Sequence, residues 1–105
     1  MRVRGNHMNE TKYLANPVVS CRDEGEEGAL LYNPDIDEAA LINRTGRIIW
    51  DFISIPRTLD EVVDHISSSP KAPASDQIAS DVDMFIKELN PDFISEVMQA
   101  GSYGV

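Results

Sequence analysis

Residues 40–66 read ALINRTGRIIWDFISIPRTLDEVVDHI, and this stretch specifies more structure than the rest of the chain. It predicts the end of a strand, followed by a helix over about Arg44–Ser54 that Asn43 caps. Pro56 prevents that helix from continuing, because proline lacks a backbone N–H and clashes with the preceding turn. Thr58 and the glutamate three residues later form a capping box, which predicts the start of a second helix.

Two apolar stripes at helical spacing follow. The second helix places apolar residues at i, i+3, i+4 and i+7, the pattern of a helix with one buried face. A third helix is expected from Ser75 to about Asn90, where Pro91 closes it. The stripes consist of Leu59, Val62, Val63 and Ile66 in the second helix, and Ile78, Val82, Phe85, Ile86 and Leu89 in the third.

Three short apolar runs precede the helices, at residues 17–22, 29–33 and 38–43. Turn-forming residues separate them, which predicts an antiparallel meander. The tail at 92–105 fits either a short strand or another helical turn. Strands followed by helices indicate an α+β domain.

The chain of 105 residues carries 18 acidic and 9 basic residues, a net charge of -9. This charge weighs against nucleic acid and anionic membrane surfaces as partners, because both attract basic proteins. No apolar run is long enough to span a bilayer, and a cytoplasmic location is the simplest expectation. The single Cys21 excludes an internal disulfide, and we interpret it as a small buried residue on a strand.

We find no pattern of catalytic residues. His7 and His65 have no cysteine or second histidine at ligand spacing, so we expect no metal site. The glycines do not form a phosphate-binding loop, so we expect no cofactor and no enzymatic activity. Trp50 allows two interpretations: it is a core residue between helix and sheet, or it is an anchor for a partner protein.

The expected binding face is the third strand, Glu38–Ile42, at the edge of the meander. Its outer side chains are small or apolar, and such an edge can capture a peptide as an added strand. The alternative is an edge covered by the chain's own tail. On the third helix, Ala79 and Ile86 lie to one side of the apolar stripe and would line a groove. The alternative there is that Ile86 widens the core face.

Several of these residues resemble the pyrroloquinoline quinone biosynthesis protein D (PqqD-like) family. The resemblance rests on Ile42-Asn43, Thr45-Gly46, Ile49-Trp50 and Arg57-Thr58-Leu59-Asp60-Glu61. It covers about residues 17–89 and implies a winged-helix-like domain, a three-stranded antiparallel sheet followed by three helices. We expect the domain over residues 14–98, with a flexible tail at 1–13 and a C-terminal tail at 99–105.

The resemblance also implies a function, which is to bind the leader segment of a ribosomally made precursor peptide and present it to a modifying enzyme. That enzyme would be of the radical S-adenosylmethionine type, and the product a quinone cofactor or another modified peptide. The leader would add as a strand along the third strand, beside the third helix. The peptide-binding residues so implied are Glu38, Ala39, Ala40, Leu41, Ile42, Ile78, Ala79, Val82, Asp83 and Ile86.

Two other functions use the same elements. A winged-helix DNA-binding regulator would use the third helix for recognition, but the acidic residues on that helix would repel phosphates. An edge-strand dimerisation module would pair the third strand with its copy in a symmetric homodimer.

Overall fold

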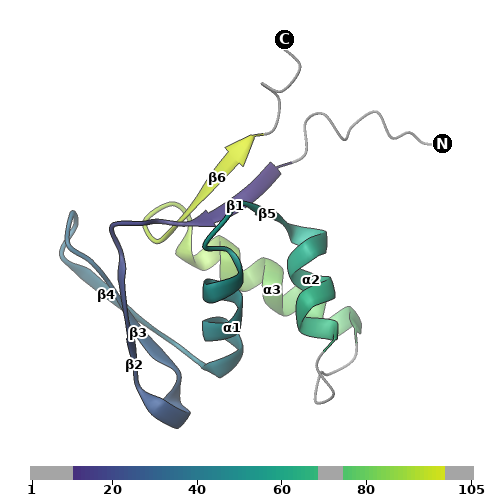
Figure 1. Cartoon of the computed structure of the whole chain (residues 1–105), viewed down its shortest axis with the longest axis horizontal. Coiled ribbons are helices and arrows are strands. Elements are labelled where there is room, and N and C mark those ends of the chain that lie inside the picture. Colours follow the sequence, from purple (N-terminus) through teal and green to yellow (C-terminus); the bar gives the residue numbers. More distant parts are fainter. Residues whose placement is uncertain (1–10, 69–74, 99–105) are drawn as a thin grey trace.

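The computed structural model describes residues 11–68 and 75–98. The expected C-terminal tail at 99–105, most of the expected linker at 67–74 and the first ten residues lie outside this part. The described chain is of the α+β class, with helices and two antiparallel sheets (Figure 1).

The first sheet is the predicted meander. Its strands are β2 (Ser20–Asp23), β3 (Ala29–Asn33) and β4 (Glu38–Ile42), in the order β2-β3-β4. The strands β3 and β4 have the predicted positions, whereas β2 begins later in its apolar run. A 3-10 turn, η2 (Gly25–Glu27), joins β2 to β3. This sheet stands to one side of the helices (Figure 1, left) and forms the wing of the fold.

The second sheet was not predicted. It consists of β1 (Thr11–Ala15), β5 (Arg57–Thr58) and β6 (Ile94–Met98), in the order β5-β1-β6. The expected flexible tail at 1–13 is therefore wrong in its last three residues, which belong to β1. The open question about the tail at 92–105 is answered by β6, which is a strand. The wrong tail boundary and the undecided strand have one cause, because β1 finds its partners far away in the chain and no local turn signals the pairing.

The first two helices begin where their caps predict. Helix α1 (Arg44–Phe52) begins after Asn43, whose side chain accepts a hydrogen bond from the Gly46 N–H. Helix α2 (Leu59–Ser67) begins after Thr58, and both hydrogen bonds of the capping box are present. These caps satisfy amides that would otherwise lack a partner in the first helical turn.

The third helix, α3 (Ser75–Leu89), lies behind α1 and beside α2 (Figure 1). Asp76 in its first turn and Lys87 in its last both interact favourably with the helix dipole. None of the helices in the described residues has the length and apolar character needed to cross a membrane.

The core includes residues of the wing, of the three α-helices and of β6. The side chain of Trp50 belongs to it and is only 7% exposed, so the core reading of this residue is confirmed. The apolar stripes of α2 and α3 also point inward as predicted. The core residues are Val19, Ala29, Leu31, Ile42, Ile49, Trp50, Ile53, Val62, Ile66, Ile78, Val82, Ile86, Leu89, Phe93 and Ile94.

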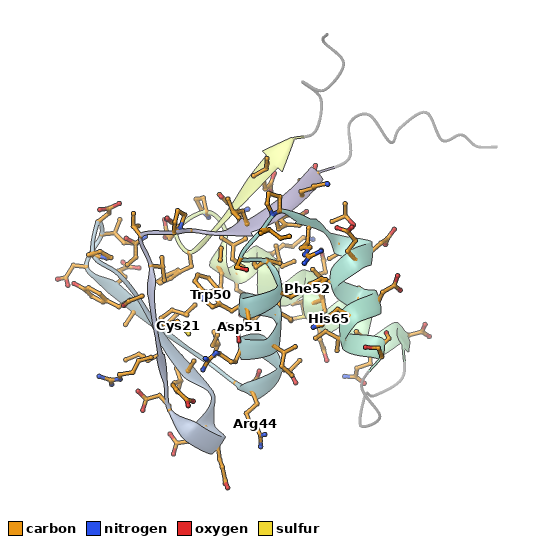
Figure 2. All side chains as sticks on the ribbon, viewed as in Figure 1. Cys21, Arg44, Trp50, Asp51, Phe52 and His65 are labelled. Atoms are coloured by element: carbon orange, nitrogen blue, oxygen red, sulfur yellow. The ribbon has the colours of Figure 1, made fainter. Side chains whose placement is uncertain are left out.

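A small aromatic cluster ties α1 to α2. The rings of Phe52 and His65 stack with centroids 4.0 Å apart and planes within 2° (Figure 2). The guanidinium of Arg57 lies 4.0 Å from the same Phe52 ring and donates a hydrogen bond to the Phe52 carbonyl. His65 therefore has a packing role against Phe52, which its position on a polar helix face did not predict.

Candidate functional site

The outer edge of β4 is open in the described chain. β4 pairs only with β3, and no described strand lies on its other side. The prediction that this strand forms an edge is thus confirmed. The described C-terminal strand β6 pairs with β1 instead, so it does not cover β4. The backbone groups along this edge are available to an added strand.

The side chains of β4 alternate between the core and the outer face of the wing. Ala40 and Ile42 lie opposite the buried Leu31 and Ala29 of β3, so they face inward. Leu41 faces outward and is 63% exposed. An added strand would therefore meet apolar side chains on both faces of the sheet.

The end of β4 meets α3 at Gly46. A Cβ atom on Gly46 would lie 2.7 Å from Cε1 of Phe85 and 3.1 Å from Cβ of Ile42. These distances show that α1, α3 and the end of β4 approach one another so closely that only glycine fits without a shift. Phe85 is half-buried, and its ring lies close to Gly46 and to the Ile42 end of β4.

The predicted groove residues of α3 differ in their exposure. Ile78, Val82 and Ile86 are core residues, and Ile86 is only 3% exposed. The expectation that Ile86 lies on a groove-lining flank is therefore wrong, and the alternative, that it widens the core face, is correct. Ala79 is exposed. The helical period places Ile86 beside the stripe, but the structure buries that position as well.

Asp83 lies on the flank of α3 that faces the second sheet. It forms an ion pair with Lys87 at 3.0 Å. Burial raises the pKa of the Tyr13 phenol of β1, the negative charges of Glu96 and Asp83 raise it further, and Lys87 lowers it. Asp83 and Phe85 point about 160° apart around the helix axis. The flank beside β4 is thus the one that carries Phe85, a residue that sequence reasoning assigned only to the core.

A signal for Phe85 was present in the sequence. The Thr45-Gly46 pair begins two residues after the helix cap Asn43 and places a glycine in the first turn of α1, where the strand passes into the helix. A glycine inside a helix costs stability, so its presence indicates that another group approaches closely. The periodicity of α3 did not reveal which of its residues is that group.

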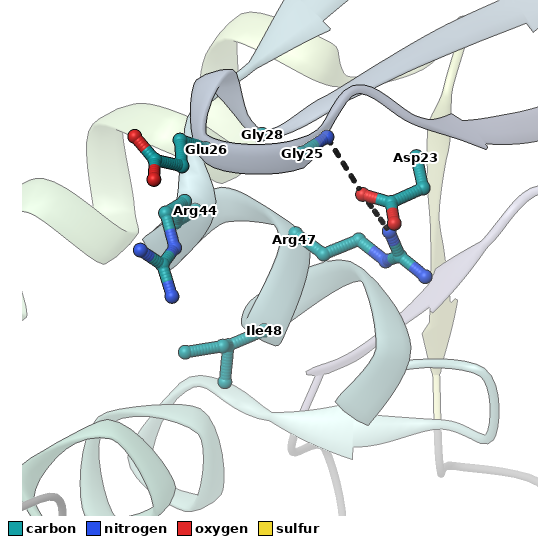
Figure 3. A pocket seen from close by; sticks show the side chains of 7 residues that line it. All are labelled: Asp23, Gly25, Glu26, Gly28, Arg44, Arg47 and Ile48. Carbon is teal, nitrogen blue, oxygen red and sulfur yellow. Dashed lines mark hydrogen bonds and ion pairs between the residues drawn. The ribbon is translucent and has the colours of Figure 1, made fainter.

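A pocket opens on the other side of the β4–α1 junction (Figure 3). It has a volume of about 520 Å³ and is open to solvent. Its lining consists of Asp23, Gly25, Glu26, Gly28, Arg44, Arg47 and Ile48. Arg47 is held by Asp23 at 3.5 Å and by Asp51 at 3.2 Å. Arg44 makes no hydrogen bond or ion pair with the described residues, so its charge is available to a ligand.

The described residues contain no group of three or more His, Cys, Asp or Glu side chains placed to hold a metal ion. The thiol of Cys21 is half-buried on β2. Burial raises the pKa of this thiol, and the positive charge of Arg47 only partly opposes the effect. Cys21 is therefore mostly protonated near neutral pH, a poor state for a nucleophile.

The geometry so far is an open strand edge with apolar neighbours. The family model described as Coenzyme PQQ synthesis protein D (PqqD) matches residues 28–90. This match agrees with the family resemblance that the motifs of residues 42–61 predicted. The chain belongs to the PqqD family. The match begins at Gly28, in the turn that packs against the end of β4, and ends just after α3. No curated protein and no solved structure matches the chain.

Membership of the PqqD family fits a role in PQQ-type biosynthesis. Proteins of this family are accessory proteins without catalysis of their own, and they imply a partner in peptide-modifying biosynthesis. The matched residues cover β3, β4 and all three described helices. They therefore contain both the open edge and Phe85.

Proposed function

We propose that this PqqD-family protein binds the leader segment of a ribosomally made precursor peptide as a fourth strand on β4. It catalyses no reaction itself and presents the precursor to a modifying enzyme, for which the family favours the radical S-adenosylmethionine class. The observation that carries the proposal is the open edge of β4, which no described strand covers.

The backbone and the side chains of the site would contribute differently to peptide recognition. Backbone hydrogen bonds to β4 supply affinity for any extended peptide, and pockets for alternate side chains supply selectivity. Inward side chains of the leader would contact Ala40, Ile42 and the ring of Phe85. Outward side chains would lie beside Ala39 and Leu41 on the outer face of the wing. The proposed site therefore keeps all of β4 and uses the Phe85 flank of α3.

Duplex DNA fits this surface poorly. The exposed side of α3 carries Asp81 and Glu88, and its one described base, Lys87, is paired with Asp83. A recognition helix needs cations to approach phosphates. The winged-helix arrangement thus serves peptide capture better than it would serve a regulator.

The test uses a library of random 12-residue peptides displayed on phage, selected on the full chain and counter-selected on an unrelated acidic protein. The selected peptides are synthesised, and amide hydrogen exchange of the protein is measured with and without them. Exchange is expected to slow along Glu38–Ile42 and to change little along Ser20–Asp23, the other edge of the same sheet. Protection confined to Ser20–Asp23, or failure to enrich any peptide, contradicts the proposal.

A matched pair of variants tests the contribution of Phe85. Phe85→Ala removes the ring beside β4 and is expected to weaken binding roughly tenfold or more, the effect of losing an aromatic anchor. Met84→Ala truncates the neighbouring side chain, which is 55% exposed, and is expected to leave affinity unchanged. Melting curves verify that both variants fold. Equal affinities for the two folded variants would remove Phe85 from the site.

A further inference from the structure

The outer face of the wing carries an apolar patch that is open to solvent. In the register of this sheet, Leu30 lies opposite Leu41, and Tyr32 lies opposite Ala39. Successive side chains of a strand point to opposite faces, so these four residues share the face that turns away from the core. All of them except the half-buried Leu30 are exposed. We call these four residues the outer wing patch. Exposed apolar patches bordered by polar residues mark interaction sites.

The border of the outer wing patch is strongly acidic. Residues 20–43 contain seven acidic residues and a single basic one, Arg22, and Arg22 is paired with Glu24 at 2.7 Å. Asp23 is paired with Arg47 on α1. The other acidic residues form no ion pair within the described chain and lie at the two ends of the patch, Glu26 and Glu27 in η2 and Asp35, Asp37 and Glu38 at the β3–β4 turn.

This charge distribution selects among the possible occupants of the patch. A second copy of the chain would bring acidic borders against each other, and like charges across an interface are unfavourable. Duplex DNA and anionic membranes would be repelled for the same reason. A protein with an apolar centre and a border of Lys and Arg would complement both the patch and its border.

A leader bound on β4 would extend the same face. An added strand continues the wing sheet beyond β4, and its outward side chains would lie next to Ala39 and Leu41. A partner seated on the patch would therefore contact the chain and the bound leader together. The protein that must contact both is the enzyme that modifies the precursor.

We propose that the outer wing patch is the docking surface for this modifying enzyme. The matching surface of the enzyme is apolar at its centre and carries Lys and Arg around it. This inference rests on the proposed function and adds to it the surface through which the chain binds the enzyme, separate from the strand edge that binds the leader.

The first test truncates the aromatic side chain of the patch. The probe is the peptide-modifying enzyme encoded beside the gene of this chain, and its affinity for the full chain is measured by surface plasmon resonance. Tyr32→Ser is expected to weaken binding roughly tenfold or more, the effect of losing an aromatic anchor. Ile55→Ser is the matched control, because Ile55 is 53% exposed and lies outside the wing. It is expected to leave affinity unchanged, and melting curves verify that both variants fold.

The second test reverses charges at both ends of the patch. The double variant Glu27→Lys with Asp35→Lys is expected to slow association of the enzyme roughly tenfold and to weaken the salt dependence of the rate, because charges at the border of an interface steer the encounter. The control, Asp81→Lys with Glu88→Lys, changes the net charge by the same amount on the exposed side of α3. It is expected to keep most of the natural association rate.

The outcomes separate the docking surface from the proposed function. Tyr32 lies on the central strand of the wing, so Tyr32→Ser is expected to leave peptide protection of β4 unchanged. An enzyme that does not bind the natural chain, or that binds folded Tyr32→Ser equally well, overturns the docking surface and leaves peptide binding in place. A natural chain that sediments as a dimer, and that Tyr32→Ser converts to a monomer, overturns it as well. Docking on the patch without any peptide that protects β4 refutes the proposed function alone.

Discussion

Gly28 provides a sharp test of how the wing is attached to the helices. Its backbone has φ 111 and ψ −122, a conformation that is essentially restricted to glycine. A Cβ atom there would lie 1.9 Å from the carbonyl oxygen of Ile42 and 2.7 Å from two backbone atoms of Asn43. These are backbone atoms at the end of β4, so no side-chain rotation relieves the clash.

The magnitude of Gly28→Ala follows from two effects. The backbone strain costs about 1–3 kcal/mol, and forcing an extra carbon into a filled space costs about 1–3 kcal/mol more. The free energy of unfolding is therefore expected to fall by about 2–6 kcal/mol. At about 4–8 °C per kcal/mol for a domain of this size, the melting temperature falls by roughly 10 °C or more.

Gly25→Ala is the matched control. It lies in the same turn with φ 69, also a left-handed conformation, but a Cβ atom there has no other atom within 4 Å. Its expected cost is the conformational one alone, about 1 kcal/mol. Thermal unfolding followed by circular dichroism compares the two variants. If Gly28→Ala melts as high as Gly25→Ala, the close contact with the end of β4 does not stabilise the fold, and the reasoning is refuted.

Three other predictions concern the core, the correction on α3 and the half-buried thiol of Cys21. Thr58→Ala removes half of the capping box and is expected to lower the free energy of unfolding by about 1 kcal/mol. Ile66→Ala opens a core cavity and is expected to lower it by about 2–5 kcal/mol. A lower denaturant midpoint for Thr58→Ala than for Ile66→Ala would contradict the boundary of α2. Ile86→Asp buries an unpaired charge and is expected to abolish cooperative unfolding, and a folded variant would return Ile86 to the surface. Because burial raises the pKa of the Cys21 thiol, thiolate absorbance is expected to appear at higher pH in the folded chain than in urea, and stability declines as pH rises between those two values. A folded midpoint at or below the unfolded one would contradict this last prediction.

The sequence alone determined the parts of the fold whose signals are local. Asn43 and the capping box at Thr58 specify helix starts through hydrogen bonds to residues three positions away. The strands β3 and β4 are neighbours in the chain, so a turn between two apolar runs was sufficient to predict their pairing. The motif of residues 42–61 was likewise enough to predict the family, which the match over residues 28–90 confirms.

Only the tertiary structure decided which distant segments meet. β1 pairs with β5 and β6, and the residues Tyr13, Arg57 and Glu96 lie far apart in the sequence. Such pairs leave no local pattern, because their hydrogen bonds form only after the helices have brought the segments together. The sequence therefore assigned the beginning of β1 to a tail and left β6 undecided.

The same distinction between local signals and tertiary structure applies to the candidate site. Alternation is a property of one strand, and the order of the three apolar runs makes the third strand an edge, so sequence reasoning predicted β4 and its position at the edge. The flank of α3 depends on how the helix is rotated against two sheets. Helical periodicity identifies the buried stripe, but both sides of that stripe are equivalent until the sheets are in place. The structure places Asp83 toward β1 and Phe85 toward the end of β4. The absence of a side chain at Gly46 leaves room for the Phe85 ring there.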